Sequence, residues 1–139
     1  MMEIRPYITF DGECTEALAL YKRAFHCREL QIMHFRDLPQ NPQWAIPEAY
    51  MDRVVQATVQ FGENFIRMSD CGPAQQLHAP ESQRISISVE TGEAEVRNAF
   101  AVLAERGRID MALSETFYSP CAGVVFDQFG VMWHLVARK

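Results

Sequence analysis

The chain has 139 residues, of which 48% are hydrophobic and 22% charged, and its formal net charge is −5 at pH 7. This composition is typical of one globular domain with a buried core, and it excludes a disordered chain. The acidic balance argues against nucleic-acid binding, and no apolar run approaches the roughly 20 residues of a membrane-spanning helix.

The first half of the chain predicts a strand, a helix and three further strands, at residues 6–10, 14–25, 28–35, 54–61 and 65–69. The helix is indicated by apolar side chains at helical spacing, and Thr15 is its expected N-cap. Residues 38–51 contain three prolines and predict a loop, which carries Trp44. A loop of this length is either a lid or binding loop, or a simple surface excursion.

The second half repeats this order after a linker. Its elements are predicted at residues 84–90, 92–106, 109–117, 121–127 and 131–137, with the second of these a helix. An internal repeat predicts an α+β fold of two tandem βαβββ units, about residues 1–71 and 84–139, joined by a linker at about 72–83. Each unit forms a four-stranded, half-open sheet with one helix, and we expect the two sheets to enclose a concave pocket within a single domain, residues 1–139.

The most informative stretch is the hairpin at residues 124–136 (VVFDQFGVMWHLV). Gly130 can adopt positive φ, and Asp127 can bond its own backbone in the turn. The strand after the turn alternates, so Trp133 and Leu135 are predicted to pack under a helix while Met132 and His134 face the pocket.

Three segments resemble the PhnB-like proteins of the glyoxalase/bleomycin-resistance/dioxygenase superfamily, also called vicinal oxygen chelate proteins. They are residues 6–25 (PYITFDGECTEALALYKRAF), 57–70 (ATVQFGENFIRMSD) and 115–133 (ETFYSPCAGVVFDQFGVMW). The resemblance covers nearly the whole chain and implies paired βαβββ units. Some relatives carry the name 3-demethylubiquinone 3-methyltransferase-like. The chain has no glycine-rich loop after its first strand, where a methyltransferase would bind its cofactor.

The resemblance also implies four ligand positions for a divalent metal on the concave strand faces. Carried over to this chain, they fall at Tyr7 (or Pro6), Arg67 (or Ile66), Arg84 (or Ser86) and His134. Two arginines would repel a divalent cation, so we expect no metal cofactor. The alternative is one divalent metal at His134, serving a lyase, an isomerase or a dioxygenase.

Alternation predicts which side chains line the concave face: Tyr7, Thr9, Arg67, Ser69, Arg84, Ser86, Ser88, Met132 and His134. Arginine's planar fork suits a carboxylate or phosphate, which favours an anionic small molecule; the alternative places both arginines in solvent at strand edges. The candidate catalytic residues are His134, Tyr7 and Glu115. Phe117, Tyr118 and Trp44 are further candidates for the pocket wall, although Phe117 and Tyr118 could instead fill the core or form a subunit contact.

The predicted function is binding or sequestration of a small molecule without metal, as the resemblance to bleomycin-resistance proteins implies. A metal-free enzyme that uses His134 and Tyr7 is a further alternative. Exposed strand edges and apolar loop residues predict a homodimer. Residues 1–7 lack the apolar core of a signal peptide, so we expect a cytoplasmic protein, in which the four cysteines are reduced structural thiols.

Overall fold

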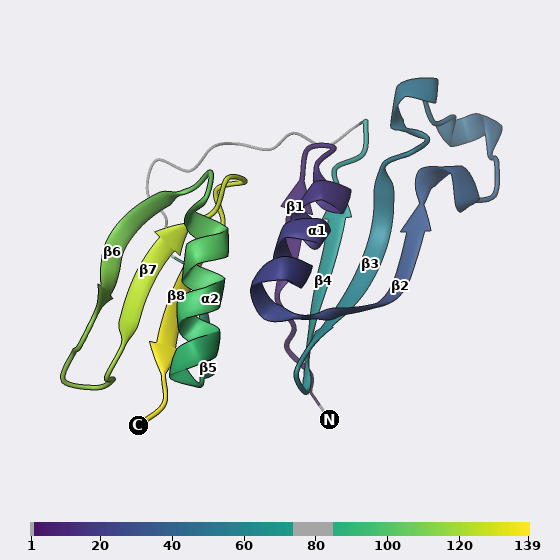
Figure 1. Ribbon diagram of the computed structural model, residues 1–139. Coiled ribbons are helices and arrows are strands. Elements are labelled where there is room, and N and C mark those ends of the chain that lie inside the picture. The colour runs from purple at the N-terminus through teal and green to yellow at the C-terminus, as the bar shows by residue number, and fades with distance from the viewer. Residues whose placement is uncertain (1, 74–84) are drawn as a thin grey trace. The chain divides into compact units, whose positions relative to one another are not determined.

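The computed structural model describes residues 2–73 and 85–139, apart from the side chain of Trp44. Each half of the chain forms one strand, one helix and three further strands, as the sequence predicts (Figure 1). The elements of the first half are β1 (Tyr7–Phe10), α1 (Cys14–Phe25), β2 (Arg28–His34), β3 (Val54–Phe61) and β4 (Asn64–Asp70). Those of the second half are β5 (Ile87–Thr91), α2 (Glu93–Ala104), β6 (Arg108–Ser114), β7 (Ala122–Phe126) and β8 (Met132–Ala137). The predicted α+β class with tandem βαβββ units is confirmed.

The chain forms two compact units that interleave along the sequence. Unit 1 contains Met1–Ala19 and Cys27–Ala79, and unit 2 contains Leu20–His26 and Pro80–Lys139. The second half of α1 therefore belongs to the unit that is otherwise built from the second half of the chain. Most of the predicted linker, residues 72–83, lies outside the described residues, as does Arg84.

Sheet A of unit 1 has the strand order β1-β4-β3-β2, with β1 parallel to β4 and the other neighbours antiparallel. The buried face of this sheet presents Phe10, Ala57, Val59, Ile66 and Met68, and each of these five side chains is at most 5% exposed.

Helix α1 begins on this buried face, where the backbone N–H of Cys14 donates a 2.9 Å hydrogen bond to Asp70 Oδ1. The prediction of Thr15 as the N-cap is wrong, because Thr15 lies inside the first turn and Asp70 supplies the acceptor from β4.

Sheet B of unit 2 has the corresponding order β5-β8-β7-β6, and α2 lies across one of its faces (Figure 1). The helix buries a stripe at helical spacing, made of Val96, Ala99, Phe100 and Leu103. The strand predicted at residues 109–117 ends earlier, at Ser114. A turn closed by the backbone N–H of Thr116 and the carbonyl of Ser119 follows it, so Phe117 and Tyr118 are loop residues.

The hairpin between β7 and β8 has the geometry that its sequence predicts. Gly130 has φ +86°, a region that glycine enters without steric cost. Asp127 Oδ1 accepts hydrogen bonds from the backbone N–H groups of Phe129 (2.9 Å) and Val131 (3.0 Å), which close the turn. Beyond the turn, Trp133 is 0% exposed and packs on the rings of Tyr21 and Phe25 in α1. The predicted register of β8 is therefore confirmed.

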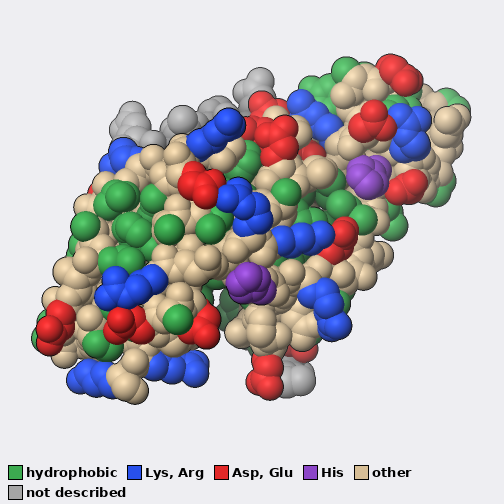
Figure 2. Space-filling view, in the orientation of Figure 1, with side chains coloured by type: hydrophobic (Ala, Val, Ile, Leu, Met, Phe, Trp, Pro, Cys, Tyr) green, Lys and Arg blue, Asp and Glu red, His purple; other side chains and the backbone are tan. Residues whose placement is uncertain are grey.

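Charged side chains of both signs are interspersed over the face seen in Figure 2, rather than gathered by sign. This distribution agrees with the absence of a basic footprint in the sequence. Within the described residues, no helix has the length and apolar character needed to cross a membrane.

Candidate functional site

The open face of sheet A, opposite its buried face, carries a row of polar side chains. The register pairs Tyr7 of β1 with Arg67 of β4, Arg67 with Thr58 of β3, and Thr58 with Gln31 of β2. Directly paired residues share a face of the sheet. One row therefore holds a phenol, a guanidinium, a hydroxyl and an amide, and the predicted site residues Tyr7 and Arg67 are neighbours in it.

The next row fixes the phenol of Tyr7 in place. Thr9 of β1 pairs with Ser69 of β4, and the Tyr7 hydroxyl donates a 2.8 Å hydrogen bond to Ser69 Oγ. Ser69 is 6% exposed, whereas Tyr7 is 53% exposed. The hydroxyl is thus oriented by a buried partner while the ring remains accessible.

Arg67 differs from Arg28 and Arg53 of unit 1 in the hydrogen bonding of its guanidinium. Its residue is half-buried, and its Nε is fully buried without a hydrogen-bond partner among the described residues. By contrast, Arg28 donates to Gln60 and Arg53 donates to Asp11. Arg67 lies on β4, which has a neighbouring strand on each side, so the alternative of a strand-edge arginine facing solvent does not describe it.

His134 occupies the open face of sheet B, on the side of β8 opposite Trp133. The register places it between Ser88 of β5 and Val124 of β7. Its Nε2 lies 3.2 Å from the hydroxyl of Tyr118, and the two rings are 5.9 Å apart in an edge-on arrangement. A half-exposed imidazole is thereby held on a strand and paired with an uncharged hydroxyl, which can either donate or accept a proton in a hydrogen bond.

The aromatic loop before β7 adds a second ring to this pair. Phe117 packs edge-on against Tyr118, with 5.0 Å between ring centroids, and Phe117 itself is 93% exposed. Tyr118 is 37% exposed. The two rings therefore border the open face at the surface and do not fill the core of the described structure.

The remaining predicted site residues are more scattered. Met132 is half-exposed two positions before His134, while Ser86 and Glu115 are exposed just outside β5 and β6. Among the described residues, no hydrogen bond or ion pair is seen between His134 and either Ser86 or Glu115. Trp44 lies in a short 3₁₀ turn, Pro42–Trp44.

The carried-over metal positions that the structure describes do not supply a donor set for a divalent cation, and the third position, Arg84, lies outside the described residues. The first two are Tyr7 and Arg67, which stand side by side in the register, and Ile66 faces the core at 5% exposure. The last is His134, whose Nε2 is engaged by Tyr118. Among the described residues, no three His, Cys, Asp or Glu side chains come together as a metal site would need. The described residues at these positions therefore do not fit the divalent metal ion that the resemblance implies.

The four cysteines are buried, reduced thiols. Burial, followed by the charge of Asp70, raises the pKa of Cys14 to about 12. Burial and a hydrogen bond to Asp11 also raise the pKa of Cys71. A nucleophilic cysteine needs a lowered pKa, so neither thiol is prepared for covalent catalysis.

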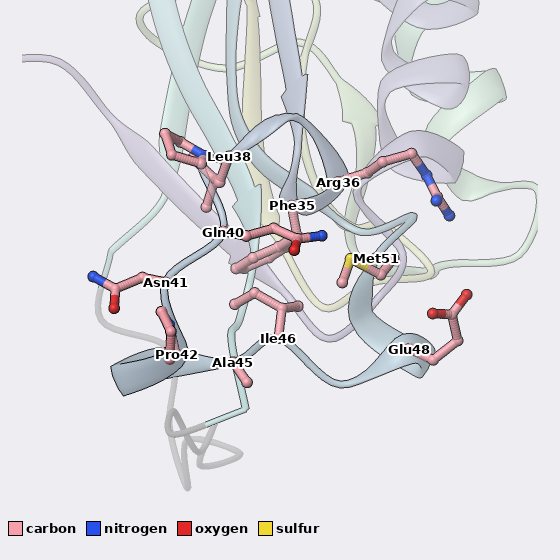
Figure 3. Close-up of a pocket in the computed structure, with 11 residues that line it drawn as sticks. Phe35, Arg36, Leu38, Gln40, Asn41, Pro42, Ala45, Ile46, Glu48 and Met51 are labelled. Atoms are coloured by element: carbon pink, nitrogen blue, oxygen red, sulfur yellow. The ribbon is translucent and has the colours of Figure 1, made fainter.

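The loop between β2 and β3, which the sequence predicts to be either a lid or binding loop or a surface excursion, contains a hollow of about 420 Å³ (Figure 3). Its lining is mainly apolar and includes Phe35, Leu38, Pro42, Ile46 and Met51. The loop is shaped by three 3₁₀ turns, Phe35–Asp37, Pro42–Trp44 and Glu48–Tyr50. The sequence feature that could have indicated this hollow is the combination of three prolines with apolar residues between them. Of the predicted site residues whose side chains the structure describes, none lines this hollow, so it is distinct from the open sheet faces.

No family model matches the chain. It is 30% identical to Protein YjdN of Escherichia coli K12 over 144 residues, covering 99% of this chain and 97% of that protein. Among solved structures, protein PA1353 of Pseudomonas aeruginosa superposes with a TM-score of 0.84 at 29% identity, covering 99% of this chain and 98% of the other. A PhnB protein from Bacillus cereus, named as a 3-demethylubiquinone-9 3-methyltransferase, has a TM-score of 0.77 at 22% identity, with coverages of 98% and 99%. The chain belongs to the PhnB-like proteins of the glyoxalase/bleomycin-resistance/dioxygenase superfamily.

Proposed function

We propose that this protein binds a small molecule without a metal ion, and that the open faces of its sheets supply the binding groups. The observation that carries this proposal is the pairing of His134 with Tyr118 on the face opposite the buried Trp133. Strand β8 fixes the backbone of His134 between two neighbouring strands, so the imidazole is preorganised for a ligand. In the tautomer whose Nε2 accepts from Tyr118, the phenol oxygen can still accept a hydrogen bond from a ligand and the Nδ1–H group can donate one.

The absence of a fitting donor set supports binding without metal over metal-dependent chemistry. A divalent cation at the carried-over positions would lie beside the guanidinium of Arg67, and that interaction is repulsive. The metal-dependent lyase, isomerase or dioxygenase therefore has weaker support from the residues of this chain. The methyltransferase name of the Bacillus cereus relative gains no support from them either.

A ligand screen tests the proposal. Wild-type protein in EDTA would be heated with each member of a defined library of small carboxylates, phosphonates and neutral aromatic compounds. We expect at least one compound to raise the Tm, His134→Ala to abolish that shift, and His34→Ala to keep it. His34 is the matched control because it is also a half-exposed histidine near the end of a strand. A shift that appears only when EDTA is left out, or that survives in His134→Ala, would contradict the proposal.

The same pair of side chains favours a second candidate, a metal-free enzyme in which His134 accepts a proton. Imidazole is the commonest acid–base group near neutral pH, and the hydroxyl of Tyr118 lies at hydrogen-bonding distance from Nε2. Tyr7 and Glu115 remain candidates for assisting groups. Turnover of a library compound that survives chelation and is lost in His134→Gln would establish this candidate.

We also propose a cytoplasmic homodimer, for which the exposed apolar side chains of unit 2 provide support. Phe117, Ile85 and Ile109 are 93%, 78% and 51% exposed. In a dimer with two-fold symmetry, one interface would cover these side chains on both copies of the chain. Light scattering at micromolar concentration is expected to give twice the chain mass of 15.9 kDa, and a mass of 15.9 kDa would reject the dimer.

A further inference from the structure

We infer that Arg67 anchors an oxyanion, a carboxylate or a phosphate-type group, of a ligand bound on the open face of sheet A. The inference rests on the proposed function in treating this face as a binding surface. It adds the chemical class of the ligand and the residue that recognises it. Every contact used below lies within unit 1.

The first observation is an unsatisfied buried donor. Arg67 Nε is the one buried side-chain nitrogen or oxygen without a hydrogen-bond partner among the described residues. Burying a polar group without a partner is unfavourable, and folded proteins satisfy nearly all such groups. The missing partner must be an acceptor, because a guanidinium carries only donors. A bound ligand with acceptor oxygens would supply it.

The second observation is the charge of the surrounding face. The strand pairing and the alternation of side chains along each strand place eleven residues on the same face of sheet A as Arg67, counting Arg67 itself. They are Tyr7, Thr9, Arg28, Gln31, Met33, Gln56, Thr58, Gln60, Phe65, Arg67 and Ser69. They include two arginines and no aspartate or glutamate. A cationic face on a chain with net charge −5 favours an anion and repels a metal cation.

The third observation is the supply of further donors beside the guanidinium. Tyr7 and Thr58 flank Arg67 in the register, and Gln31 follows Thr58 in the same row. The hydroxyl of Thr58 or the amide N–H of Gln31 can donate to an oxyanion whose other oxygens meet the arginine, while the hydroxyl of Tyr7 already donates to Ser69. Arginine presents its donors as a planar fork that matches both carboxylate and phosphate geometry. The row therefore offers the groups that oxyanion recognition needs.

Arg28 provides an internal comparison on the same face. Its Nη2 already donates a 2.8 Å hydrogen bond to Gln60 Oε1, and the residue is exposed. Charge alone would make both arginines respond to an anion. The unsatisfied Nε instead predicts that Arg67 responds specifically.

The test follows the Nε–Hε resonances of the arginines in the full-length, ¹⁵N-labelled protein. Sodium acetate and sodium phosphate are titrated at constant ionic strength, with sodium chloride as the reference. We expect a saturable shift of the Arg67 resonance with at least one oxyanion, and none with chloride. Acetate and phosphate are separate arms, so the stronger response identifies the ligand as carboxylate-like or phosphate-like.

Variants then assign the response, measured as oxyanion affinity from backbone shifts of β3 and β4. Arg67→Met is expected to weaken binding by at least about ten-fold, whereas Arg28→Met removes the same charge and is expected to change affinity by less than about two-fold. If Arg67→Met does not fold, Arg67→Lys keeps the charge, loses the fork and is expected to bind about ten-fold more weakly.

The absence of a saturable shift with both oxyanions, or equal weakening in the Arg67 and Arg28 variants, would overturn the inference. The His134 screen uses a residue of unit 2, so either result can fail while the other stands.

Discussion

The indole N–H of Trp133 donates a 3.0 Å hydrogen bond to Asp127 Oδ2 in the buried part of unit 2. The same oxygen accepts a 2.6 Å hydrogen bond from the hydroxyl of Tyr21, while Oδ1 closes the hairpin turn. One carboxylate thus ties the turn, the indole and a helix together. Because successive residues of a strand alternate, fixing Trp133 on the buried face also fixes His134 on the open one.

Trp133→Ala is expected to lower the free energy of unfolding by about 3–5 kcal/mol, as large truncations in a core do. Its ring is fully buried and packs on two aromatic rings of α1. Urea denaturation monitored by circular dichroism would measure the change, with Met132→Ala on the opposite, half-exposed face as the control. A loss no larger than that of the control would show that the assigned register is wrong.

Tyr21→Phe removes one hydroxyl and leaves the ring packing intact. The hydroxyl bonds a buried carboxylate, and hydrogen bonds to charged groups contribute about 1.5–3 kcal/mol, so we expect a loss of that size. In a background of Asp127→Asn the same substitution should cost less, because the charged acceptor is already gone. Additive effects in this double-mutant cycle would contradict the assigned contact.

Asp11 is predicted to make stability depend on acidic pH. The thiol of Cys71 and then the guanidinium of Arg53 hold the pKa of this carboxyl below its ordinary value of 3.8. A lowered folded-state pKa stabilises the fold above the unfolded value, and the contribution is lost as pH falls through the folded value. Asp11→Asn should therefore lower the Tm at pH 7 and have progressively less effect below pH 3.8.

The control is Asp52→Asn, which breaks the well-exposed ion pair with Arg36 and is expected to change the Tm little at either pH. An Asp11→Asn deficit that is unchanged between neutral and strongly acidic pH would refute the electrostatic assignment.

The cysteines are expected to be unreactive in the folded protein. All four are buried, and the pKa of Cys14 is raised to about 12, so its reactive thiolate is scarce at pH 8. A chromogenic disulfide reagent should titrate no thiol rapidly in buffer and four in urea. A raised folded-state pKa also means that stability is present below 9.0 and declines as pH rises from there towards 12. Rapid native labelling of Cys14 would contradict the packing of α1.

His134→Ala is expected to change the free energy of unfolding by less than about 0.5–1 kcal/mol, because the ring is half-exposed and its hydrogen bond to Tyr118 lies at the surface. Loss of ligand response in this variant can then be read as loss of a binding group. A deficit as large as that of Trp133→Ala would show that His134 is a core residue.

The sequence predicts those features that depend on local pattern. Alternation after Gly130 placed Trp133 and His134 on opposite faces, and the repeated order of strand and helix indicated the fold. The contact between Tyr21 and Asp127 was out of reach, since the two residues are separated by 106 positions. The unsatisfied Nε of Arg67 was equally hidden, because burial of a single atom depends on neighbouring strands. The cap supplied by Asp70 was missed for the same reason.

The most direct test of binding without metal is elemental analysis of the native protein, purified without chelator and measured by inductively coupled plasma mass spectrometry. We predict far less than one equivalent of nickel, zinc, iron or manganese per chain, and a Tm that is unchanged by EDTA. About one equivalent of one of these metals, removed by EDTA together with a fall in Tm and restored in both respects on re-addition, would contradict the account.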